Sequence, residues 1–86
     1  MATHFQGRVE RLYTSTDATF VRIRIPVAQQ PLENYFRLRR SHENYNALYS
    51  LALTAAINGY DLLIRTIGDV SPGQEAVVRY MVVDFD

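Results

Sequence analysis

Arginine and aromatic residues alternate along two short segments, and their types and spacing could support binding chemistry. The six positions are Phe20, Arg22 and Arg24 in the first segment and Tyr35, Arg37 and Arg39 in the second. An aromatic ring can stack on a nucleobase, while a planar guanidinium group can bind phosphate or carboxylate through two parallel hydrogen bonds. If the two segments are neighbouring strands, these side chains share one face, which Arg40 extends. The pattern therefore predicts a ligand-binding face.

The overall charge leaves several ligands open for this face. The chain has nine arginines, no lysine and nine acidic residues, so its net charge is zero. Proteins that bind nucleic acids usually carry an excess of basic residues. Single-stranded nucleic acid, an acidic protein and a glycan are therefore all retained as partners. A further alternative is a solvated strand face in which the arginines pair across strands with acids such as Glu10.

Catalytic and metal-binding patterns are missing from the sequence. The acidic residues are scattered through turns and near the termini, there is no cysteine, and His4 and His42 are the only histidines. Ser41, His42 and Glu43 are adjacent, and adjacent residues of a helix do not face each other as a catalytic triad requires. The four glycines are too dispersed to form a phosphate-binding loop. We expect a protein that is not an enzyme and needs neither a metal nor a cofactor.

Five strands and one helix are expected along the chain. The predicted strands are residues 5–13, 19–25, 35–39, 62–67 and 76–85, and the predicted helix is residues 43–58. The alternation of apolar and polar residues slips at Leu12 and Tyr13, which indicates a bulge or a bend. A helix between the third and fourth strands is typical of the OB fold. We predict one domain over residues 1–86, a small five-stranded OB-like barrel, with an open α+β sheet as the alternative.

The predicted helix has no charged side. One stripe is apolar, and the remaining face is small and uncharged, consisting of Asn46, Ala47, Ser50, Thr54 and Asn58. A helix without a charged face is usually buried on more than one side. Because 86 residues are too few to cover it twice, we expect a second copy of the chain, or another protein, to cover this face. The alternative is a solvated Asn, Ser and Thr face that happens to lack charge.

Residues 44–67, NYNALYSLALTAAINGYDLLIRTI, carry a resemblance to a known family. The helix pattern L-x-x-L-A-L-x-A-A, followed by Asn-Gly and an apolar strand, resembles the B subunits of AB5-type toxins, especially the subtilase-cytotoxin type. The resemblance implies an OB fold and a pentameric ring whose helices line the centre, and it implies glycan binding. No sugar-binding motif of the family is matched, so no residue role is carried over.

The sequence shows neither a secretion signal nor a membrane span. Residues 1–11 have no apolar run, and the stretch from Tyr45 to Tyr60 is too short and too polar to cross a bilayer. We expect a cytoplasmic protein with no membrane association. The leading hypothesis is a self-associating, non-enzymatic OB-like binding module whose ligand is unknown. The alternatives are single-stranded nucleic-acid binding through the arginine and aromatic face, and a structural or adaptor subunit of a larger complex.

Overall fold

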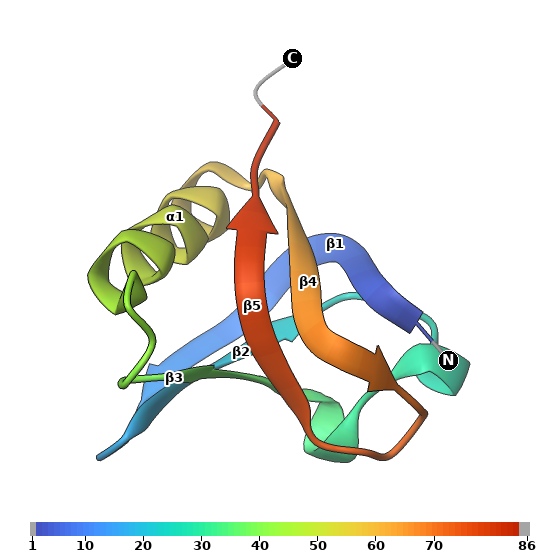
Figure 1. The fold of residues 1–86 in the computed structure, drawn as a ribbon. Coiled ribbons are helices and arrows are strands. Elements are labelled where there is room, and N and C mark those ends of the chain that lie inside the picture. Colours follow the sequence, from blue (N-terminus) through green and yellow to red (C-terminus); the bar gives the residue numbers. More distant parts are fainter. Residues whose placement is uncertain (1, 85–86) are drawn as a thin grey trace.

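The computed structural model of the chain describes residues 2–84. In chain order the elements are β1 (Ala2–Thr14), β2 (Ala18–Ile23), two 3-10 turns (Val27–Gln29 and Leu32–Asn34), β3 (Phe36–Arg39), α1 (Tyr45–Asn58), β4 (Asp61–Val70) and β5 (Ala76–Val82) (Figure 1). The predicted order is confirmed. The second strand ends at Ile23 instead of residue 25, and the helix begins at Tyr45 instead of residue 43. Residue 85, the predicted end of the last strand, lies outside the described residues.

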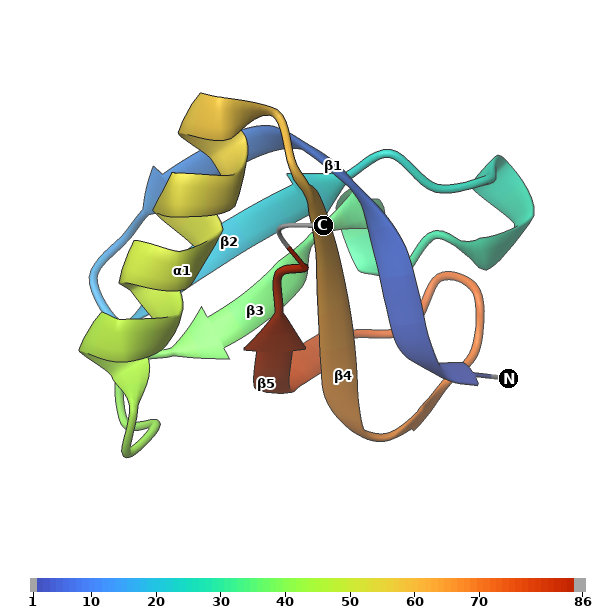
Figure 2. The ribbon, with the colours of Figure 1, turned by 90° about the horizontal axis from the view of Figure 1, so that it is seen from above.

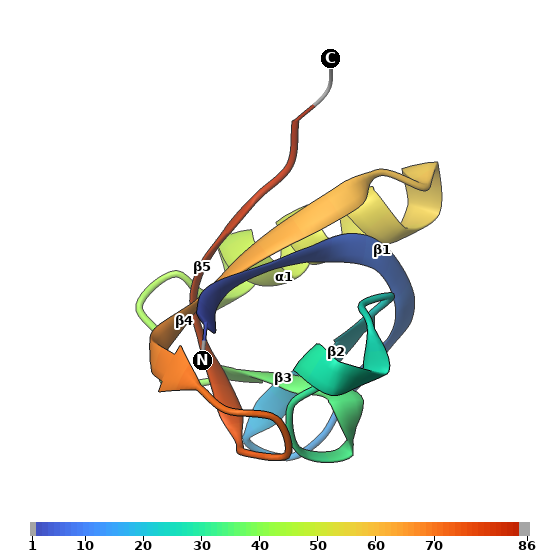
Figure 3. The ribbon, with the colours of Figure 1, turned by 90° about the vertical axis from the view of Figure 1, so that its right-hand side faces the viewer.

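The five strands form a closed barrel in the order β1-β2-β3-β5-β4. Strand β1 is long and curved, and it pairs with β4 through its first half and with β2 through its second half (Figure 3). Strands β3 and β5 close the barrel as a parallel pair, with Phe36 opposite Ala76 and Arg37 opposite Val77. The other neighbouring strands are antiparallel. The sheet is therefore closed, and the prediction of an OB-like barrel is confirmed.

A bulge in β1 reverses the direction in which its side chains point. Val9 is opposite Ile23, and the next partners are Arg11 and Arg22, so Glu10 is the extra residue. A bulge of this kind bends the strand and resets its alternation. The odd-numbered residues from Phe5 to Val9 pack towards the core, whereas those after Glu10 point outwards. The bulge predicted from the slipped alternation is confirmed, and it lies two residues before Leu12.

The two ends of the barrel are built differently (Figure 2). Helix α1 lies at one end and inserts Leu48, Ala52 and Ala55 into the core. A hydrogen bond of 2.6 Å between Tyr45 Oη and Thr19 Oγ1 ties the start of the helix to β2. The loops that join β2 to β3 and β4 to β5 lie at the opposite end, away from the helix (Figure 2).

Close packing of the backbone at Gly7 helps to hold the curvature of β1. A Cβ atom at this position would lie 2.1 Å from the carbonyl oxygen of Arg24, which no side chain tolerates. The same region carries a backbone hydrogen bond of 2.8 Å from Arg24 N to Arg8 O. Glycine therefore allows β1 to approach the chain that leaves β2.

Candidate ligand-binding face

Strands β1, β2 and β3 place six side chains in two rows on the outer surface of the barrel. In one row Tyr13 is opposite Phe20, which is opposite Arg37. In the next row Arg11 is opposite Arg22, and Tyr35, directly before β3, completes it. We call this surface the aromatic–arginine face, and its members are Arg11, Tyr13, Phe20, Arg22, Tyr35 and Arg37. The predicted pairing of the two alternating segments as neighbouring strands is confirmed.

The three rings of the face contact one another. Tyr13 and Phe20 are stacked with their centroids 4.9 Å apart, and Tyr35 meets both edge-on, at 5.3 Å from Tyr13 and 6.1 Å from Phe20. Such ring pairs are favourable beyond the area that they bury. Tyr13 keeps 42% of its surface exposed, although it belongs to this cluster. The rings therefore form a fixed platform with an open side.

The arginines of the face lie against these rings. The guanidinium carbon of Arg22 is 4.7 Å from the centroid of Tyr35, and that of Arg37 is 5.3 Å from the centroid of Phe20. Arg11 Nη1 donates a hydrogen bond of 3.3 Å to Tyr35 Oη, and this bond raises the pKa of the Arg11 guanidinium. A guanidinium that is stacked on a ring on one side can still receive a base or a phosphate on the other. The cations are thus held in orientation before a ligand arrives.

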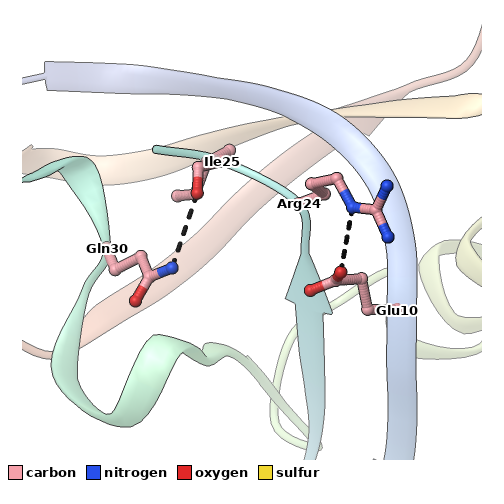
Figure 4. A network of polar contacts seen from close by, with 4 residues as sticks. All are labelled: Glu10, Arg24, Ile25 and Gln30. Atoms are coloured by element: carbon pink, nitrogen blue, oxygen red, sulfur yellow. Dashed lines mark hydrogen bonds and ion pairs between the residues drawn. The ribbon is translucent and has the colours of Figure 1, made fainter. Parts of the chain in front are cut away.

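Arg24 does not belong to the platform, although the sequence pattern included it. It lies just beyond the end of β2, where its Nε donates to Glu10 Oε2 at 3.1 Å and its side chain is 76% exposed (Figure 4). Nearby, Gln30 Nε2 donates to the carbonyl oxygen of Ile25 at 3.4 Å, which holds the chain leaving β2. The predicted pairing with Glu10 is confirmed for this arginine.

Arg39 is placed next to the platform and not within it. It is opposite Ala18 at the end of β3, and together with Arg37 and Arg40 it lines an open hollow beside the β1–β2 turn. Arg37 also forms an ion pair of 3.2 Å with Glu75. Within residues 2–84 the two arginine–glutamate pairs described above are the only ion pairs. Arg11, Arg22 and Arg39 therefore keep their charge available for a ligand.

Sequence reasoning did not assign Arg11 and Tyr13 to the face. Both enter it because the extra residue at Glu10 turns the second half of β1 outwards. The slip of the alternation at Leu12 and Tyr13 was the signal that could have found them. If the alternation is counted again from Arg11 onwards, the second half of the first predicted strand adds to the face beside the other two strands.

The second predicted surface is the outer side of α1. All five residues predicted there, Asn46, Ala47, Ser50, Thr54 and Asn58, are exposed in the protomer. Thr54 Oγ1 donates to Ser50 O at 2.8 Å, and Asn58 Nδ2 donates to Thr54 O at 2.9 Å. Leu53 and Ile57 are also exposed, to 38% and 74%. We call these seven residues the helix face; it carries no charge.

Two further features concern residues 2–84 only. In this part of the chain no three His, Cys, Asp or Glu side chains are grouped closely enough to hold a metal ion. Over the same residues the structure contains no helix with the length and apolar character needed to cross a bilayer.

Comparison with known proteins does not assign the chain to a family. No family model matches it, and no curated protein or solved structure matches it either. The likeness to toxin B subunits therefore rests on the order of the elements and the helix pattern, and what the structure establishes is a small β-rich fold of five strands and one helix.

Proposed function

We propose that the chain is a non-enzymatic OB-like binding module whose aromatic–arginine face binds single-stranded nucleic acid. The observation that carries the proposal is a cluster of three rings in mutual contact on one outer face, with one guanidinium group stacked on each of two rings and a third hydrogen-bonded to Tyr35. Stacking on rings accommodates any base, and arginines track the phosphates beside them. Binding of oligonucleotides on the outer strands is a frequent use of this fold.

The distribution of charge supports this ligand even though the net charge is zero. Residues 10–40 carry six arginines and only three acidic residues, Glu10, Asp17 and Glu33. The remaining acidic residues are mostly placed after the helix begins. A local excess of one sign steers a charged polymer towards the surface that carries it. The zero net charge of the whole chain therefore does not describe the local charge of the face.

The test is fluorescence anisotropy with a labelled twelve-residue oligothymidylate at 50 mM salt. We expect binding by the wild type and loss of binding by the double variant Arg22→Glu with Arg37→Glu. The matched control is Arg8→Glu with Arg65→Glu, which changes the net charge equally on the β1–β4 side of the barrel. If the position of the charges and not the total charge determines affinity, the affinity of this control should lie within about threefold of that of the wild type.

Two results would overturn the nucleic-acid proposal. One is the absence of binding by the wild type at low salt, and the other is equal affinity of the wild type and the Arg22 and Arg37 double variant. A polyglutamate peptide and a neutral oligosaccharide are assayed alongside. Binding of either one in place of the oligonucleotide would identify an acidic protein or a glycan as the partner class.

A second candidate function, self-association, is favoured by the helix face. Ile57 and Leu53 are exposed there, and Thr54 and Asn58 direct their hydrogen bonds to carbonyls of their own helix. Polar groups that already have partners add little desolvation cost when a surface is covered. We propose that a second copy of the chain covers this face, and the resemblance to toxin B subunits extends this proposal to a pentameric ring.

Sedimentation velocity at tens of micromolar tests self-association. We expect a species heavier than the 9.9 kDa of one chain, and a pentamer would have five times that mass. Ser50→Glu places a charge in the middle of the helix face and should return the protein to monomers, while Glu43→Gln, before the helix, should not. A wild type that stays monomeric under these conditions would contradict the proposal.

A further inference from the structure

A small hollow opens at the edge of the aromatic–arginine face, where the loop after β4 meets the loop after β2. Its lining consists of Phe20, Leu32, Glu33, Tyr35, Arg37 and Glu75. Its volume is about 60 Å³. The hollow lies beside two rings of the face, Phe20 and Tyr35, so it can receive the polar groups at the edge of a base that is stacked on the face.

Glu33 is the carboxylate of this hollow that remains unengaged. The other one, Glu75, is paired with Arg37 at 3.2 Å. Among residues 2–84, no hydrogen bond or ion pair engages the side chain of Glu33. An ionised carboxylate only accepts hydrogen bonds, and its two oxygens can accept two parallel ones. The hollow thus offers a double acceptor to whatever edge enters it.

The backbone around Glu33 is held in an unfavourable conformation. Glu33 and Asn34 have φ angles of 57° and 60°, in the left-handed region that asparagine tolerates and glutamate rarely adopts. Two backbone hydrogen bonds fix the turn, from Leu32 N to Gln74 O at 2.7 Å and from Tyr35 N to Leu32 O at 3.2 Å. Strain of this kind persists where the surroundings impose it, and it is concentrated at ligand-binding sites. The turn therefore keeps Glu33 at the hollow.

The four bases present different edges to such an acceptor. The Watson–Crick edge of guanine carries two adjacent donors, an imino and an amino group, which match the two oxygens of a carboxylate. Adenine and cytosine each offer one amino group beside an acceptor nitrogen, and thymine and uracil place one donor between two carbonyl oxygens. We infer that Glu33 gives the aromatic–arginine face a preference for guanine at the position next to Tyr35. This inference rests on the proposed binding of single-stranded nucleic acid.

The test compares four nine-residue oligothymidylates that carry G, A, C or T at the central position. In fluorescence anisotropy we expect the oligonucleotide with guanine to bind about five- to tenfold more tightly than the other three, because a good bidentate contact discriminates by at least this factor. Glu33→Gln replaces one acceptor oxygen by a donor, so the preference should disappear while the affinity for the all-thymidine strand is kept. Glu43→Gln makes the same change outside the hollow and before the helix; it is the matched control and should keep the preference.

Glu33→Gly separates recognition by the carboxylate from an effect on the shape of the turn. Glycine adopts positive φ without strain, so this variant should melt at the same or a higher temperature and still lose the preference. Retention of the preference in Glu33→Gly, or equal affinity for all four oligonucleotides, would overturn the inference and leave the proposed function standing. Absence of binding to every oligonucleotide would instead overturn the proposed function.

Discussion

The aromatic–arginine face and the helix face are both open to solvent in the protomer, but they manage their polar groups in opposite ways. On the first, the guanidinium groups of Arg22 and Arg37 lie on rings, and the Nε atom of each has no hydrogen-bond partner among the described residues. On the second, Thr54 and Asn58 turn their donors back to the backbone of their own helix. Exposure alone therefore does not define a surface, because the state of its hydrogen-bonding groups decides what can cover it.

This difference favours a different kind of partner for each of the two proposed binding surfaces. Arginines held on rings gain most from a partner that brings phosphate charges, and they lose hydration when an apolar surface covers them. An uncharged helix face with exposed Leu53 and Ile57 gains from an apolar surface and offers nothing to phosphate. The two proposed functions therefore use separate surfaces of the chain and do not compete for the same residues.

Salt should have the largest effect on the difference between the two surfaces. For binding to a single strand, the logarithm of the association constant falls with the logarithm of the salt concentration, with a slope of about −0.7 for each neutralised phosphate. Three guanidinium contacts therefore predict a loss of about 20-fold between 50 and 200 mM salt. Self-association through the uncharged helix face should change by less than about twofold over the same range. Anisotropy and sedimentation in matched buffers measure both quantities, and parallel salt dependence would break the distinction between the surfaces.

A somewhat smaller effect is expected from removing the most exposed ring of the platform. Tyr13→Ala should weaken oligothymidylate binding about tenfold, because stacking of one base contributes about 1–3 kcal/mol. Tyr13→Phe keeps the ring and should bind like the wild type, since the hydroxyl that accepts from Arg11 belongs to Tyr35. Neither variant should alter sedimentation. Urea unfolding checks that the variants are folded, and unchanged affinity in Tyr13→Ala would remove the platform from the binding surface.

The fold could be predicted from the sequence because the turn residues and the alternation of apolar and polar residues agree along most of the chain. Apolar residues at Val21, Ile23 and Phe36 alternate with polar ones, and they are fully buried as the pattern predicts. Gly59 adopts a φ of 69° and ends the helix where the sequence placed its end. Exact strand ends were less predictable, since pairing with a neighbour and not local composition decides where a strand stops. This is why β1 extends to Ala2 and β2 stops at Ile23.

The candidate face was predictable only in part, and the reason is tertiary. Phe20, Arg22, Tyr35 and Arg37 follow from simple alternation on two paired strands. The contribution of β1 depends on a single extra residue, whose effect on side-chain direction appears only when the partner strand is known. The hollow beside Tyr35 depends on a turn in which Glu33 has a positive φ angle. Glutamate rarely adopts such an angle, so the residue type does not predict this turn.

The smallest expected effect concerns Arg24, which the sequence pattern includes in the face and the structure separates from the rings. Its guanidinium is paired with Glu10 at 3.1 Å and largely exposed, so Arg24→Ala should weaken oligonucleotide binding by no more than about twofold. Loss of an exposed ion pair should change the free energy of unfolding by less than about 0.5 kcal/mol. Arg22→Ala, which removes a cation stacked on Tyr35, should weaken binding by about fivefold or more. Equal losses in the two variants would mean that the ligand follows the whole length of β2, and the six-residue pattern of the sequence would then describe the face better than contact with the rings does.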